Sequence, residues 1–72
     1  MKDDFKQFVI ELSQEDTPVG DLCIDLLRDN DFNWEWNTTE IRKYISELPD
    51  RYGNHLEYAT RKFLKMLDKQ FN

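Results

Sequence analysis

Apolar residues recur along this chain at helical rather than strand spacing. Phe5, Phe8, Val9 and Leu12 follow the i, i+3, i+4, i+7 rule, which places them on one side of a helix. Three later segments show similar spacing, and no segment sustains the period-two alternation of a half-buried strand. The pattern therefore predicts four helices, each with one apolar side.

Local residues predict where these helices begin and end. Thr17 is a suitable N-cap for the second helix, because Pro18 follows at the first helical position, where a missing N–H costs nothing. Asn37 and Glu40 have the spacing of a capping box at the start of the third helix. Pro49 discourages continuation of that helix.

The fourth predicted helix is the longest. Asn54 with Glu57 could cap it, or it could start as early as Asp50. The predicted buried positions of the last three helices are Val19, Leu22, Cys23, Ile24, Leu26 and Leu27; Ile41, Tyr44, Ile45 and Leu48; and Leu56, Ala59, Phe63, Met66, Leu67 and Phe71.

The stretch from Asp29 to Asn37 is the one long connection, and it is rich in aromatic residues. Phe32, Trp34 and Trp36 occupy alternate positions in it. Large rings are costly to leave in water, so we expect one or two of them to pack into the core. The sequence predicts an all-α, compact four-helix bundle that forms a single domain over residues 1–72.

Charge is unevenly distributed along these 72 residues, whose formal net charge is -5. Residues 1–37 contain ten Asp and Glu against three Lys and Arg, whereas residues 38–72 contain five against seven. The acidic average argues against general coating of nucleic acid, which requires neutralisation of phosphates. It leaves room for a local basic face.

Composition also indicates the cellular compartment of the protein and whether it is associated with a membrane. A lone cysteine, Cys23, cannot form an intrachain disulfide and indicates a reducing compartment. No apolar run approaches the roughly 20 residues of a membrane span, and the N-terminus lacks the apolar stretch of a secretory signal. We expect a cytoplasmic protein without membrane association.

Catalysis is not expected from the residues present. His55 is the only histidine, and no recognised nucleophile setting surrounds it. Cys23 lies on the apolar side of the second predicted helix, which is typical of a small buried core residue rather than of a reactive thiol. We predict a non-enzymatic protein with no catalytic residues and no cofactor.

Residues 29–40, DNDFNWEWNTTE, resemble a helix-flanked calcium loop in their oxygen-bearing side chains. The candidate ligands are Asp29, Asp31, Asn33, the carbonyl of Glu35, Asn37 and Glu40. Trp34 does not fit the pattern of a calcium loop, because it occupies the sixth place, where the left-handed backbone conformation requires glycine. The spacing of Asn37 and Glu40 is shared by an ordinary capping box, which is the alternative interpretation. Calcium binding is therefore a lesser hypothesis.

Two charged surfaces are candidates for binding. The acidic face consists of Asp21, Asp25, Asp29, Asp31 and Glu35, the first three at helical spacing in the second helix. The basic face of the fourth helix consists of Arg61, Lys62, Lys65 and Lys69. Each could instead be a solvated surface that keeps the protein in solution.

Several motifs together resemble the YozE-like family of short bacterial proteins with SAM-like (sterile alpha motif-like) domains. These motifs are FKQF near the start, TPVGDLCIDLLRDNDF through the second helix, EIRKYI in the third, and ATRKFL in the fourth. They cover nearly the whole chain, although Asn33 stands where the family usually has proline. The resemblance implies a SAM-like helical bundle and implies no catalytic residue.

The function expected from these features is that of a protein-interaction or regulatory adaptor domain. Its partner is a protein of unknown identity, and self-association between the acidic face of one copy and the basic face of another is possible. The alternative is nucleic-acid binding through the basic face.

Overall fold

The protein is described by a computed structural model that covers residues 2–71, apart from the side chain of Lys2. It divides into two compact units, Met1–Trp36 (the N-terminal unit) and Asn37–Asn72 (the C-terminal unit). Every regular element within the described residues is a helix, so the predicted all-α class is confirmed. Four of these helices, α1, α2, α3 and α5, correspond to the four that the apolar spacing predicts.

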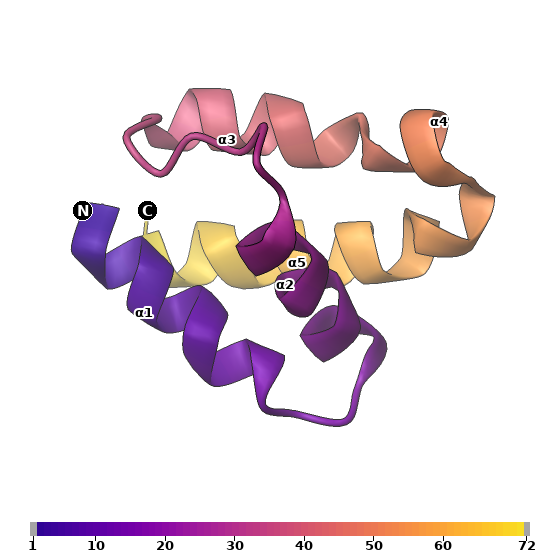
Figure 1. The fold of residues 1–72 in the computed structure, drawn as a ribbon, viewed down its shortest axis with the longest axis horizontal. Helices are drawn as coiled ribbons and strands as arrows, with labels where there is room; N and C mark the ends of the chain where they lie inside the picture. Colours follow the sequence, from indigo (N-terminus) through magenta and orange to yellow (C-terminus); the bar gives the residue numbers. More distant parts are fainter. Residues whose placement is uncertain (1, 72) are drawn as a thin grey trace. The chain divides into compact units, whose positions relative to one another are not determined.

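The N-terminal unit contains α1 (Lys2–Ser13) and α2 (Pro18–Arg28), which pack against each other (Figure 1). The Thr17 hydroxyl accepts a hydrogen bond from the backbone N–H of Gly20 at 2.9 Å, which confirms the predicted N-cap. Phe5, Val9, Leu22 and other apolar side chains of the two helices are buried. Most residues of the sequence-predicted apolar sides therefore face the interior of this unit.

Gly20 marks a close approach between the start of α2 and the end of α1. A Cβ atom at this position would lie 2.1 Å from the backbone oxygen of Glu15 and 2.9 Å from that of Leu12. Both are backbone atoms, which cannot rotate away as a flexible side chain can. A side chain at residue 20 is thus excluded without movement of the chain.

The aromatic loop that follows α2 packs into the N-terminal unit. The ring of Phe32 is 6.0 Å from that of Phe5, and it also has an edge-on contact with Trp34 at 4.8 Å and with Trp36 at 5.3 Å. Phe32 is buried, whereas the two tryptophans are partly exposed. The prediction that loop rings belong to the core is confirmed, and Lys6 covers Trp34 from outside at 5.4 Å.

The C-terminal unit contains α3 (Thr38–Ser46), α4 (Leu48–Tyr52), the 3-10 turn η1 (Asn54–Leu56) and α5 (Glu57–Phe71). In Figure 1, α5 runs back along α3 in the opposite direction, after α4 and η1 reverse the chain. The capping box at α3 is confirmed: Asn37 Oδ1 accepts from the Glu40 N–H at 2.9 Å, and Glu40 Oε1 accepts from the Asn37 N–H at 3.0 Å.

The connection between α3 and α5 differs from the prediction. The third helix ends at Ser46, before Pro49, as predicted, but Pro49 also lies in the first turn of an additional short helix, α4, where its missing N–H costs nothing. Asn54 does not cap the long helix, since it opens η1 and α5 begins at Glu57. Gly53 makes this turn possible because its φ of 123° is accessible mainly to glycine.

A few predicted core positions are also corrected. Leu27 is exposed, because the buried stripe of each helix is narrower than its run of apolar residues. For the same reason the following predicted core residues are only half-buried: Phe8, Ile24, Leu56, Met66 and Phe71. Thr60, which the apolar pattern passes over, is buried beside Ala59 in α5.

Candidate functional site

The uneven charge of the chain coincides with its structural division. The N-terminal unit carries ten Asp and Glu against three Lys and Arg, and the C-terminal unit carries five against seven. One compact unit is therefore strongly acidic and the other mildly basic. The acidic face belongs entirely to the first and the basic face entirely to the second.

The basic face is a continuous stripe along α5. All four cations, Arg61, Lys62, Lys65 and Lys69, are exposed, while Phe63 and Leu67 on the other side of the helix are buried. Their spacing of three and four residues places them on neighbouring turns. The helix thus directs its apolar residues inward and presents these cations to solvent, as the sequence predicts.

The acidic residues near this stripe neutralise it only in part. Asp68 is paired with Arg42 of α3, so its charge is directed toward that neighbouring helix. Glu57 pairs with Arg61 at 3.2 Å, but both side chains are more than 60% exposed, so screening by water makes this pair weak. Lys65 and Lys69 make no ion pair with any residue between 2 and 71. Positive charge therefore dominates the stripe.

Tyr58 is an exposed aromatic residue beside the basic face that the linear pattern understates. It lies one turn before Lys62, whose Nζ is 5.5 Å from the centre of the tyrosine ring, and the ring is 56% exposed. Tyr58, Arg61, Lys62 and Lys65 together line a hollow of about 90 Å³. The i, i+4 spacing of Tyr58 and Lys62 in the sequence is the signal that could have placed them together.

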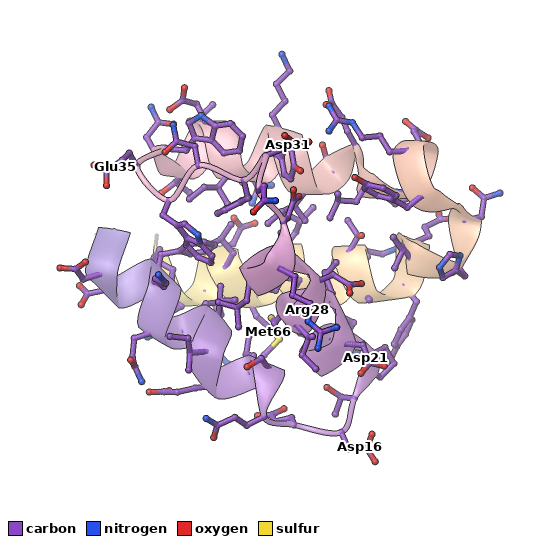
Figure 2. All side chains as sticks on the ribbon, viewed as in Figure 1. Asp16, Asp21, Arg28, Asp31, Glu35 and Met66 are labelled. Atoms are coloured by element: carbon purple, nitrogen blue, oxygen red, sulfur yellow. The ribbon has the colours of Figure 1, made fainter. Side chains whose placement is uncertain are left out.

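The acidic face is more extended and less uniform than the basic one. Asp21, Asp25, Asp31 and Glu35 are exposed, and Asp29 is half-buried. Figure 2 shows the labelled acids Asp21, Asp31 and Glu35 spread over α2 and the loop beyond it rather than gathered at one point. Arg28 also lies on this side of α2, seven residues after Asp21, and it reduces the negative charge there.

Side-chain oxygens of the proposed calcium loop already have backbone partners. The Asp29 carboxylate accepts from the Asp31 N–H at 2.8 Å, and the Asn33 amide oxygen accepts from the Glu35 N–H at 2.9 Å. These are local turns of the kind that Asp and Asn favour. The capping box occupies Asn37 and Glu40 in the same way.

Trp34 also lacks the backbone conformation that the sixth place of a calcium loop requires. Within residues 2–71 no residue other than glycine has a positive φ. Over the same residues, no group of three or more His, Cys, Asp or Glu side chains is arranged to hold a metal ion. The side-chain oxygens of Asp29, Asn33, Asn37 and Glu40 therefore serve turns and a helix cap.

Cys23 and His55 occupy contrasting environments. Cys23 is fully buried in α2, and burial, with a smaller contribution from the negative charge of Glu15, raises the pKa of its thiol to about 12. The thiol is therefore protonated at neutral pH and a poor nucleophile. His55 is exposed in η1, in the turn that follows Gly53.

None of the helices in residues 2–71 combines the length and the apolar composition that a membrane crossing requires. Comparison with known proteins gives no relative from which a function could be transferred: the chain matches no protein-family model, no curated protein and no solved structure. The resemblance to YozE-like SAM-like domains therefore stays a prediction drawn from the sequence motifs alone.

Proposed function

We propose that this chain is a cytoplasmic, non-enzymatic interaction domain that binds partners through its two charged faces. The observation that carries the proposal is the segregation of charge, with an acidic unit and a mildly basic one, each presenting its charges outside an apolar interior. Complementary charge on a partner would increase the association rate and select the correct partner. The buried, protonated Cys23 and the exposed His55 are consistent with a domain that binds rather than catalyses.

The acidic face is proposed to dock a basic protein surface. Asp21 and Asp25 are its best-placed contacts, because both are exposed and lie one turn apart in α2. The proposed partner surface could belong to another protein or to the basic face of a second copy. A contact between unlike faces of two copies would be heterologous and would extend into chains unless it closes into a ring.

A charge-exchange experiment tests both forms of this contact. Variant one carries Asp21→Lys and Asp25→Lys, and variant two carries Lys62→Glu and Lys65→Glu. If copies associate, the wild type sediments faster as protein concentration rises at low salt, each variant alone stays monomeric, and their mixture associates again. If another protein is the partner, affinity capture from the native host recovers it with wild type and loses it with variant one.

Asp3 and Asp4 provide the matched control for the acidic face. They are exposed acids on α1, so Asp3→Lys with Asp4→Lys gives the same change in net charge at a different surface. Capture that is lost equally with this control would assign the effect to net charge and contradict docking on the acidic face. The proposal also fails if neither association nor capture depends on either face.

A second candidate function, nucleic-acid binding through the basic face, is supported by Tyr58. A site that binds single-stranded nucleic acid needs aromatic surface as well as cations, and the four residues of the basic face supply only cations. The exposed Tyr58 ring, adjacent to Lys62 and in the same hollow as Arg61 and Lys65, supplies such a surface. Cations with an adjacent ring are the usual elements of sites that contact both phosphates and bases.

A further inference from the structure

The hollow on α5 is too small to enclose a cofactor or a metabolite. Its volume is about 90 Å³, and sites that enclose such ligands usually measure about 300 to 1,000 Å³. All its lining residues, Tyr58, Arg61, Lys62 and Lys65, come from one exposed helix face. A hollow of this kind can hold one small group of a much larger ligand that lies across the surface.

The charge of the lining indicates that this group is an anion. Three of the four lining residues are cations, and the only ion pair formed by them within the described chain is the solvent-exposed one between Arg61 and Glu57. Lys69 extends the cationic stripe beyond the hollow. With a rise of about 1.5 Å per helical residue, the cations from Arg61 to Lys69 span about 12 Å along α5. A ligand with several consecutive anionic groups would contact more of them than a single ion would.

Tyr58 distinguishes among such polyanions. Its ring is 56% exposed and contributes an aromatic surface directly beside the cations. An acidic peptide would use the cations but has no general need for that ring. A nucleic-acid duplex keeps the faces of its bases stacked internally, whereas a single strand can place an unstacked base on an aromatic side chain.

We propose that the Tyr58 face of α5 binds single-stranded nucleic acid, with phosphates at Lys62, Lys65 and Lys69 and one base stacked on Tyr58. This inference rests on the second candidate function and specifies its ligand and its stacking residue. Because each base has an aromatic face, binding of this kind depends little on sequence. Because phosphate contacts release counterions, it weakens steeply as salt is added.

Fluorescence anisotropy of labelled oligonucleotides provides the test. The probes are a single strand of uridines of about 12 nucleotides and a duplex of equal length, titrated with the full-length protein between about 20 and 200 mM salt. The single strand should bind more tightly than the duplex. Tyr58→Ala should weaken single-strand binding roughly 5- to 150-fold, and Tyr58→Trp should retain it.

Two matched controls separate a local effect from a general one. Tyr52 is as exposed as Tyr58, at 57% against 56%, and it does not line the hollow, so Tyr52→Ala should leave binding unchanged. Lys65→Gln should reduce the slope of log K against log salt by about 0.7 for a single strand, while Lys43→Gln on α3 should not change it. Circular dichroism of each variant confirms that its helices are intact.

The possible outcomes distinguish failure of stacking on Tyr58 from failure of nucleic-acid binding as a whole. If Lys65→Gln weakens binding but Tyr58→Ala does not, or if the duplex binds as tightly, nucleic-acid binding stands and the stacking proposal is overturned. If no nucleic acid binds at the lowest salt, both are overturned. Equal competition by poly-glutamate would indicate an acidic protein partner and would also overturn the proposal, while the acidic face would remain testable by charge exchange.

Discussion

The rings of Phe5 and Phe32 stack with their centres 6.0 Å apart and an angle of 27° between their planes. Phe5 belongs to α1, and Phe32 belongs to the loop that follows α2, so this contact fixes the loop to the first helix of the N-terminal unit. Trp34 also contacts Phe5, at 5.8 Å. An acidic loop is thereby held in place by aromatic packing.

Replacing Phe32 should therefore destabilise the protein. Phe32→Leu removes the ring contacts with Phe5, Trp34 and Trp36 and should lower the free energy of unfolding by about 1 to 2 kcal/mol. Urea denaturation followed by circular dichroism measures the change. Tyr52→Leu is the control, because that ring is 57% exposed and its replacement should stay within about 0.5 kcal/mol. Equal losses for the two variants would contradict a packed loop.

Gly20→Ala should be destabilising, although alanine normally favours a helix by about 1 kcal/mol over glycine. The new Cβ would lie 2.1 Å from the backbone oxygen of Glu15, after α1, and 2.9 Å from that of Leu12 in α1, so the start of α2 must move away from both. We expect a loss of about 2 to 3 kcal/mol in the free energy of unfolding, measured by thermal or urea denaturation. The neighbouring exposed position gives the control, since Asp21→Ala should change stability little. A stabilised Gly20→Ala variant would show that this close approach is absent in solution.

Cys23 predicts a loss of stability at high pH. Burial, and to a smaller extent Glu15, raise the pKa of its thiol from 9.0 to about 12 in the folded state. Between these values the unfolded chain releases the thiol proton and the folded chain retains it, so the folded state binds more protons and stability falls as pH rises. The contribution is fully present below about pH 9 and is lost as pH rises toward about 12.

Comparison with Cys23→Ala isolates this effect from other groups that titrate at high pH. Both proteins are denatured with urea from neutral pH to about pH 11. The difference between their free energies of unfolding should be constant below pH 9. Above pH 9 the free energy of unfolding of the wild type should fall relative to that of Cys23→Ala. The thiol should also react slowly with a thiol reagent until the protein is unfolded. Rapid reaction of the native protein at neutral pH would contradict a buried, protonated Cys23 thiol.

Calcium should leave the fluorescence of Trp34 and Trp36 unchanged. The oxygens of Asn37 and Glu40 cap α3, and Trp34 does not adopt the positive φ that the sixth place of a calcium loop needs. Emission spectra with millimolar calcium and then with chelator provide the measurement. A reversible change that disappears in Asp31→Asn would instead support the calcium hypothesis.

Much of the fold follows from local sequence. The apolar spacing of Phe5, Val9 and Leu12 identifies one helix, and the caps at Thr17 and Asn37 place the starts of two others, because periodicity and N-cap hydrogen bonds depend on residues only a few positions apart. The exposed cations of α5 follow in the same way from a helix whose other side is apolar.

Only the tertiary structure decided features that depend on residues distant in the chain. Which loop ring is buried depended on packing against α1, because Phe32 stacks on Phe5. The pairing of Asp68 with Arg42 required α3 to lie beside α5. The sequence by itself determined helices, caps and charge segregation through short-range physics, whereas packing decided which polar groups are engaged inside the fold and which, like Tyr58 and its neighbouring lysines, are exposed to solvent.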